Sequence, residues 1–466
     1  MGNAESSAYQ KRALRLQPEE KARIGVAFEK MLVAVLKEDP AAKKIVTLEK
    51  FKAYVSESLP EAMAVRIYNA VRSVDVEDKA SAASENITKE QLTAFVSDLY
   101  RGNVDERGDA ILRLIAENAQ VQGSQVRQFA EELIIALVHI LQFKKLMNGW
   151  SSKTTREAIT GGKVLAAHFL SELKPSDRHL LTGPEVLEYS FEKAEIGNWI
   201  YRVPLVSAFL MAVISHGLSI MYPEGDIHKG LGNLVPRCKG TKRAPCNTVL
   251  GLVPVIYINS HLPNECQHRW RLLFATWAHG ESFSQLCAQI VYQGPTLLVV
   301  KDTEGHLFGG FASASWEMKP QFQGDTRCFL FTILPHVEVF MYSGFNNHYM
   351  YLNSGQQTMP NGLGMGGQHD YFGLWIDSNF GKGHSKAKPK CTTYNSPQLS
   401  GSETFSIDVL EVWAVGDPPD QEERAKRSIL DSDPEARALL EMSGRVRHSE
   451  GLRQKSRDVE EEEDLG

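Results

Sequence analysis

The chain has little cysteine for its length, and all of it lies in the second half. Only six cysteines occur among 466 residues, the first of them at Cys238. They form no Cys-x-x-Cys pair and no cysteine–histidine quartet with zinc-finger spacing, which argues against a structural zinc site. We therefore expect free, mostly buried thiols in a reducing compartment.

An excess of positive charge is also missing. Lys and Arg number 51 against 57 Asp and Glu, which leaves a formal net charge of −6. Proteins that wrap nucleic acid need a basic surface, so this balance argues against nucleic acid as a partner. Apolar residues make up 42% of the chain and aromatic residues 9%, which excludes a disordered protein and allows two to four domains.

Long apolar runs are rare. One stretch, residues 203–223, contains no Lys, Arg, Asp or Glu and comes close to the shortest membrane span. Pro204, Gly217 and several serines dilute it, so we expect a buried helix, with a membrane span as the alternative. The first residues carry no basic segment followed by an apolar one, so no secretory signal is expected and the protein should face the cytosol.

The N-terminus matches a lipidation motif. Met1-Gly2-Asn3-Ala4-Glu5-Ser6 fits the acceptor pattern for N-myristoylation, which predicts Gly2 as the modified residue once Met1 is removed. One myristoyl chain binds a membrane only marginally. A second, electrostatic contact with an anionic leaflet could come from three basic residues, whose alternative role is a solvated helix start: Lys11, Arg12 and Arg15. Residues 1–17 are thus a predicted lipidation and basic segment.

Residues 18–235 have helical periodicity. Pro18 and two acidic residues open an apolar pattern that runs to Pro40. Thr88 and Gln91 have the spacing of a capping box, and the residues flanking Thr88 fit a hydrophobic staple. A further stripe predicts a core helix: Val126, Phe129, Leu133, Leu137 and Ile140.

Part of this region resembles an EF-hand. Residues 87–92 look like the end of a calcium loop that leads into its second helix. A working loop needs oxygen ligands at alternate positions and a glycine at the sixth. Here Asp75, Glu77 and Asp78 are followed by Ala and Ser, without that glycine. We expect a degenerate EF-hand-like region that does not hold calcium.

Residues 240–416 change to short β-rich runs separated by Gly, Asn and Pro. The pattern predicts strands at 296–301, 306–313, 327–333, 337–343, 349–353, 371–376 and 404–409. Between them, Ser282 is positioned to cap a short helix. The sequence therefore predicts an α+β protein, in which a β-sandwich with flanking helices follows an all-α region.

This second half resembles the TLDc domain family. The motifs occur in the family's order: Leu272-Leu273-Phe274, Gly280-Glu281-Ser282-Phe283, 294–302, 305–312, Trp316, 328–331, 373–377 and Glu411-Val412-Trp413. The resemblance implies a β-sandwich, a link to oxidative-stress resistance and binding to the vacuolar proton-pumping ATPase (V-ATPase). The cysteine-free helical half and the myristoylation motif are most similar to a branch of the family at lysosomal membranes, tied to TOR kinase signalling. No catalytic residue is implied.

Motifs that could indicate an enzyme lack their required context. Gly362 to Gly367 matches G-x-G-x-x-G but is not followed by a helix, so we expect a flexible β-connection and no cofactor. Ser282 lacks the second glycine of a nucleophile elbow, and Cys287 fits an apolar helix face. Six histidines lack i, i+4 pairs; most are expected in loops or at the surface, with convergence of two of them left open: His279, His306, His336, His348, His369 and His384. A redox-protective protein or a hydrolase with a TLDc pocket is the alternative.

Residues 417–466 form a charged tail. The segment 421–442 has the pattern of a helix with a narrow apolar edge, and an acidic run ends the chain. We predict that this edge binds a partner, with docking on the TLDc domain as the alternative: Ile429, Leu430, Leu439, Leu440 and Met442. The expected protein is a non-enzymatic adaptor in the cytoplasm and on the cytoplasmic face of lysosomal membranes. Its expected partners are V-ATPase subunits, the TOR kinase complex and, through myristate, the membrane.

Overall fold

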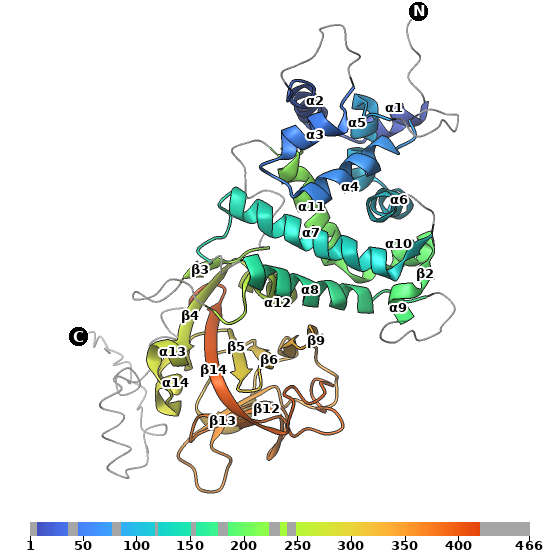
Figure 1. Ribbon diagram of the computed structural model, residues 1–466. Coiled ribbons are helices and arrows are strands. Elements are labelled where there is room, and N and C mark those ends of the chain that lie inside the picture. Colours follow the sequence, from blue (N-terminus) through green and yellow to red (C-terminus); the bar gives the residue numbers. More distant parts are fainter. Residues whose placement is uncertain are drawn as a thin grey trace, which may run out of the picture.

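The computed structural model describes residues 7–35, 45–76, 85–116, 120–150, 155–175, 185–222, 234–239 and 248–419 (Figure 1). The predicted α+β class is confirmed, because a helical region precedes a region of antiparallel strands. The helices of the first region are α1 (Ser7–Leu14), α2 (Pro18–Leu32), α3 (Leu48–Val55), α4 (Glu61–Arg72), α5 (Lys89–Arg101), α6 (Val104–Ile115), α7 (Gly123–Phe143), α8 (Thr155–Ser171), α9 (Glu185–Glu188), α10 (Lys193–Arg202) and α11 (Pro204–Gly217). Two short strands, β1 (Val121–Gln122) and β2 (Ser190–Phe191), pair beside them.

The predicted helix starts are confirmed where a side chain caps the helix. The Gln91 amide nitrogen donates to Thr88 Oγ1 at 3.2 Å, and the Thr88 amide donates to Gln91 Oε1 at 3.0 Å. These two bonds satisfy amides that the first turn of α5 leaves unpaired. Helix α2 begins at Pro18 as expected but ends at Leu32, so Val35 lies outside the helix that the apolar pattern predicted.

Helices α2 to α5 have the arrangement of paired EF-hands. Two helix–loop–helix units, α2–α3 and α4–α5, are joined by a single antiparallel bridge between Val46 and Ile87. The two amides donate to the opposite carbonyls at 2.9 and 3.0 Å. Glu77 and Asp78 lie outside the described residues, so the absence of calcium binding stays a prediction. Within the described residues, no group of three or more His, Cys, Asp or Glu side chains could hold a metal ion.

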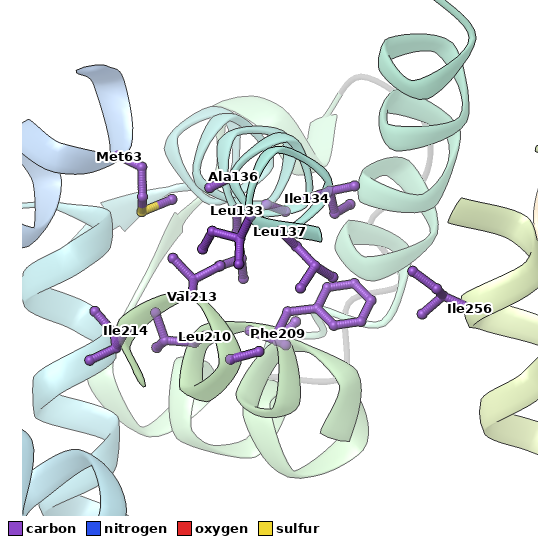
Figure 2. Packing of buried hydrophobic residues seen from close by; sticks show 14 of the residues in the cluster. Met63, Leu133, Ile134, Ala136, Leu137, Phe209, Leu210, Val213, Ile214 and Ile256 are labelled. Atoms are coloured by element: carbon purple, nitrogen blue, oxygen red, sulfur yellow. The ribbon is translucent and has the colours of Figure 1, made fainter. Parts of the chain in front are cut away.

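The centre of the helical region is formed by α7 and α11. Figure 2 shows Leu133 and Leu137 of α7 directed toward Phe209 and Leu210 of α11, and all four are buried. The prediction of a buried helix within 203–223 is thus confirmed. No single described helix is long and apolar enough to cross a membrane; α10 and α11 reach that length and composition only as a pair, bent by 92°.

The described part of the second region contains three α-helices, a short 3-10 helix (Asn264–Cys266) and most of the strands. Its helices are α12 (Leu252–His261), α13 (Thr276–His279) and α14 (Phe283–Ile290). Its strands are β3 (Arg237–Lys239), β4 (Arg269–Ala275), β5 (Thr296–Asp302), β6 (Leu307–Ala312), β7 (Lys319–Gln323), β8 (Phe329–Leu334), β9 (Glu338–Phe340), β10 (Met350–Asn353), β11 (Gly362–Gln368), β12 (Tyr371–Asp377), β13 (Lys382–His384) and β14 (Thr404–Val415).

The strands form one path that folds into two facing sheets. The order is β7-β10-β11-β12-β13-β14-β5-β6-β8-β9, with β4 also paired to β14. Strand β14 begins beside β13 and ends between β4 and β5, so it belongs to both sheets. We call β4, β5, β6, β8, β9 and the end of β14 the first sheet, and β7, β10–β13 and the start of β14 the second sheet. Buried residues of both fill the space between them, which confirms the predicted β-sandwich.

The helical region covers the outer face of the first sheet. Leu297, Val299 and Phe311 of this face belong to the same hydrophobic core as α7 and α11. Helices α8 and α12 lie where the helices meet the strands (Figure 1). The Trp150 ring lies 5.6 Å from that of Trp270 and 5.3 Å from that of Trp413, measured between centroids. The helical region and the first sheet therefore share one continuous core.

Candidate functional site

The residues predicted to bind a membrane or a partner lie outside the described residues. This applies to Gly2 and to the apolar edge of the tail: Ile429, Leu430, Leu439, Leu440 and Met442. Their roles stay predictions. The structure does place the points from which these segments extend, since α1 begins at Ser7 and the last described residue, Pro419, follows β14.

Helix α1 is fixed to the helical region by two of the three basic residues near the N-terminus. Both terminal nitrogens of Arg15 donate to Glu106, at 2.7 and 2.8 Å. Arg12 Nε lies 3.4 Å from Asp98 Oδ1, and the Arg12 carbonyl accepts from Ser97 Oγ at 2.6 Å. Arg12 lies in the last turn of α1 and Arg15 follows that helix, so the alternative of a solvated helix start is wrong for both. Contact of the basic residues with an anionic leaflet stays a prediction.

Asp98 is the buried partner in this contact. Its side chain is 4% exposed, and burial raises its pKa to about 6 although Arg12 lowers it. Glu106 also raises this pKa, whereas Arg113 and Arg15 lower it. The contact between α1 and α5 thus contains a carboxyl group that titrates near neutral pH.

The serine and glycine motifs have structural roles. Ser282 Oγ accepts from the Gln285 amide at 3.4 Å at the start of α14, which confirms the predicted cap. The glycine run 362–367 is not a flexible connection, because it forms buried strand β11 between β10 and β12. A Cβ atom at Gly364 would lie 2.6 Å from the Phe372 ring, so the strand needs glycine to lie under that ring. Strand β12 follows β11 directly, where binding of a pyrophosphate would need the N-terminus of a helix.

Three of the histidines converge on aromatic rings of the second sheet. His348 and His369 stack on Phe322, with centroids 4.1 and 5.2 Å away, and His384 stacks on Trp375 at 5.8 Å. His348 and His369 lie in loops, as expected, whereas His384 lies in β13, and all three side chains are half-buried. Burial lowers the pKa of His384 to about 4, and its Nδ1 has no hydrogen-bond partner among the described residues.

A Ser–His–Asp group in the sandwich lacks the order of a catalytic triad. Ser400 Oγ donates to Asp302 Oδ2 at 2.7 Å, and His306 Nδ1 lies 3.0 Å from the same oxygen. A nucleophilic serine must instead donate its proton to the histidine. The other oxygen of Asp302 accepts from the amides of Glu304 and His306 at 3.0 and 2.8 Å, so Asp302 holds the β5–β6 turn in place.

The cysteines of the sandwich are buried thiols. This holds for Cys266, Cys287, Cys328 and Cys391, as expected. Burial raises the pKa of Cys266 to about 11 and also raises that of Cys328 and Cys391, which keeps these thiols protonated at neutral pH. Cys238 is disulfide-bonded, so the expectation of free thiols was wrong for this residue.

Glu411 of β14 is a buried carboxylate with four donors. Thr248 Oγ1 and Trp413 Nε1 donate to Oε2 at 2.7 and 3.1 Å, and the Val249 amide and Trp277 Nε1 donate to Oε1 at 3.1 and 3.3 Å. Burial raises the pKa of Glu411, while these hydrogen bonds lower it. Glu411 belongs to a motif of the TLDc resemblance, but no sequence pattern indicated that its side chain fixes the segment before α12 to β14.

Comparisons with known proteins agree with this architecture. The TLDc domain family matches residues 252–416. The chain is 53% identical to MTOR-associated protein MEAK7 of Gallus gallus over all of both chains. It is 47% identical to the protein of that name from Homo sapiens, over 97% of this chain and 99% of that protein.

A more distant relative matches a smaller part of the chain. Nuclear receptor coactivator 7 of Homo sapiens is 33% identical over 172 residues, which are 36% of this chain and 17% of that protein. The names of these relatives describe associated proteins and a coactivator rather than enzymes.

Proposed function

Because the chain belongs to the TLDc domain family and is related over its full length to MTOR-associated proteins, we propose that it is a non-enzymatic adaptor in TOR kinase signalling. The observation that carries this proposal is the full-length match, which includes the helical region as well as the sandwich. A shared domain alone would leave the role of the first half open.

The chemistry of the described side chains supports an adaptor. Ser282 caps a helix, Ser400 donates to Asp302, and the thiols of the sandwich are buried and protonated. A nucleophile needs an exposed position, whereas Ser400 and these thiols are buried and Ser282 Oγ accepts a hydrogen bond from the Gln285 amide. The function would then depend on surfaces that bind other proteins.

The proposal extends to a location and a further partner. We infer that a myristoyl group on Gly2 tethers the chain to the lysosomal membrane and that V-ATPase subunits bind there. A single acyl chain gives marginal membrane binding, whereas protein contacts add to it by raising the effective concentration. The apolar edge within 429–442 would supply a second contact with the pump.

The TOR link is tested by immunoprecipitation of the full-length chain from cells. We expect the TOR kinase to be recovered with the chain and not with an unrelated protein that carries the same affinity tag. Equal recovery of the TOR kinase with the full-length chain and with the unrelated control protein would contradict the proposal.

The membrane and pump contacts are tested by co-sedimentation with lysosomal membranes. Gly2→Ala should move the chain to the supernatant, whereas Asn3→Ala keeps the acceptor glycine and should not. Deletion of 420–457 should reduce recovery of V-ATPase subunits from detergent extracts without changing myristoylation. Unchanged fractionation of Gly2→Ala would contradict the myristoyl tether. Unchanged recovery of V-ATPase subunits with the 420–457 deletion would exclude the tail from pump binding.

A further inference from the structure

A groove of about 720 Å³ runs along strand β9 at the edge of the first sheet. One wall is the continuous stretch 338–343, which contains β9 and the three residues after it. The other wall is formed by residues between 390 and 397. Strand β9 pairs with β8 on one side, and within the described residues no strand pairs with its other side.

The two walls are joined at one end by hydrogen bonds. The Ser343 amide donates to the Thr393 carbonyl at 2.8 Å, and Ser343 Oγ donates to the Thr392 carbonyl at 2.5 Å. Thr393 Oγ1 in turn donates to Asn346 Oδ1 at 2.7 Å. The groove is therefore preformed, and a ligand would not have to order its walls.

The floor of the groove is part of the sandwich core. Phe340, Cys391 and Tyr394 line it and are 7%, 1% and 1% exposed. The rim differs from the floor, because Met341 and Phe345 are 51% and 84% exposed. Covering an apolar rim of this kind with another chain lowers the free energy, because apolar surface is removed from water.

The rim also carries one charge of each sign. Glu338 and Lys390 both line the groove and are exposed, and neither has an ion-pair partner among the described residues. A complementary ligand would carry a basic and an acidic group beside its apolar ones.

We propose that this groove binds an extended segment of another protein, which adds as a strand along the free edge of β9. Its backbone pairs with residues 338–342, and its alternate side chains cover Phe340 and the rim, since successive side chains of a strand point to opposite sides. A basic residue of the segment meets Glu338, and an acidic one meets Lys390.

The strand edge favours this occupant over the alternatives. A small molecule would fit the volume but would leave the amides and carbonyls of the β9 edge without partners. A helix has no backbone donors to offer along its length, because its own turns use them. An extended peptide satisfies both the edge and the apolar rim.

The proposal is tested with a phage-displayed library of random 12-residue peptides, selected on the full-length chain. Enriched sequences are synthesised with a fluorophore, and their Kd is measured by anisotropy. We expect apolar residues at alternate positions, and we expect Phe345→Asp and Met341→Asp each to raise Kd about tenfold or more. Tyr371→Asp is the matched control, because Tyr371 is a 57% exposed aromatic residue of the same sandwich outside the groove. It should leave Kd within about twofold.

Amide hydrogen exchange supplies a second readout that a merely destabilised variant would not mimic. Bound peptide should slow exchange at 338–342 in the wild-type chain, and Glu338→Lys should weaken peptides that carry a basic residue. The proposal is overturned by a failure to enrich peptides, by equal Kd in Phe345→Asp and wild type, or by binding without slower exchange at 338–342. Displacement of the enriched peptides by a synthetic peptide of residues 420–457 would also overturn it, because the occupant would then be this chain itself.

Discussion

The two sheets of the sandwich cover their outer faces in different ways. The first sheet is packed between the sandwich core and the helical region, and six of the seven residues of β5 are buried. Among the described residues, the outer face of the second sheet carries a small aromatic cluster, formed by Tyr351, Phe372 and Trp375 with Phe322 at its edge. Half-buried histidines lie against these rings.

This difference shows that the segments covering a strand constrain which residue types the strand can carry. A strand covered on both faces has no reason to alternate, which explains the unbroken apolar run of β5. Strand β11 of the second sheet is instead rich in glycine, because the rings of Phe372 and Trp375 lie close over Gly364. The first sheet should thus depend on the helical region, and the second should depend on its aromatic cluster.

The substitution with the largest expected effect on this comparison is Trp150→Ala. Trp150 extends from the helical region onto Trp270 and Trp413 and donates to the Pro236 carbonyl at 2.8 Å. We expect the free energy of unfolding to fall by about 3–5 kcal/mol, measured by urea denaturation. Tyr201→Ala, at an 82% exposed position, should change it by less than about 0.5 kcal/mol. Equal effects would mean that the first sheet is independent of the helices.

In the second sheet, the pH dependence of stability should report on His384. Its pKa is about 4 in the folded chain against an ordinary value of 6.5. As pH falls from 6.5 to 4, the unfolded chain takes up a proton that the folded chain does not, and about 3 kcal/mol of stability is lost. His384→Gln should remove this loss, while His336→Gln, at an exposed loop position, should retain it. A wild-type chain with no acid-dependent loss would contradict the burial of this imidazole.

Asp98 in the helical region should act in the opposite direction. Its folded pKa of about 6 exceeds the ordinary 3.8, so the folded chain binds the proton first as pH falls. Stability from this group should rise by about 2–3 kcal/mol between pH 6 and 4 and be absent above pH 6. Thermal unfolding of Asp98→Asn against wild type across this range measures the effect. Glu29→Gln, at an exposed position of α2, should leave the pH profile unchanged.

The smallest expected effects are those of two glycine substitutions, one in the second sheet and one in the helical region. Gly364→Ala would push a methyl group into the Phe372 ring and should cost about 1–2 kcal/mol. Gly197→Ala in α10 meets nothing within 4 Å and should stabilise the chain by about 0.5–1 kcal/mol. Urea denaturation of both variants checks the signs, and a neutral Gly364→Ala would mean that the cluster does not constrain β11.

Local patterns in the sequence were sufficient for part of this structure. The Thr88 cap, the buried helix within 203–223 and the alternating start of β14 each depend on residues close in the chain. Strand β11 was missed because its glycines are explained by Phe372, which belongs to another strand. The partners of Arg15 and Glu411 were missed for the same reason, since Glu106 lies 91 residues and Thr248 lies 163 residues away.

Strand β14 has a mechanical consequence. Its C-terminal end is paired on both sides, with Val415 opposite Trp270 of β4 and Ala414 opposite Thr296 of β5. Any pulling force that reaches the sandwich through residues beyond 419 acts along this strand. Because the ladder hydrogen bonds are perpendicular to an antiparallel strand, such a force shears two ladders at once instead of opening them bond by bond. Both ladders would therefore resist such a force together, and the sandwich would keep its shape.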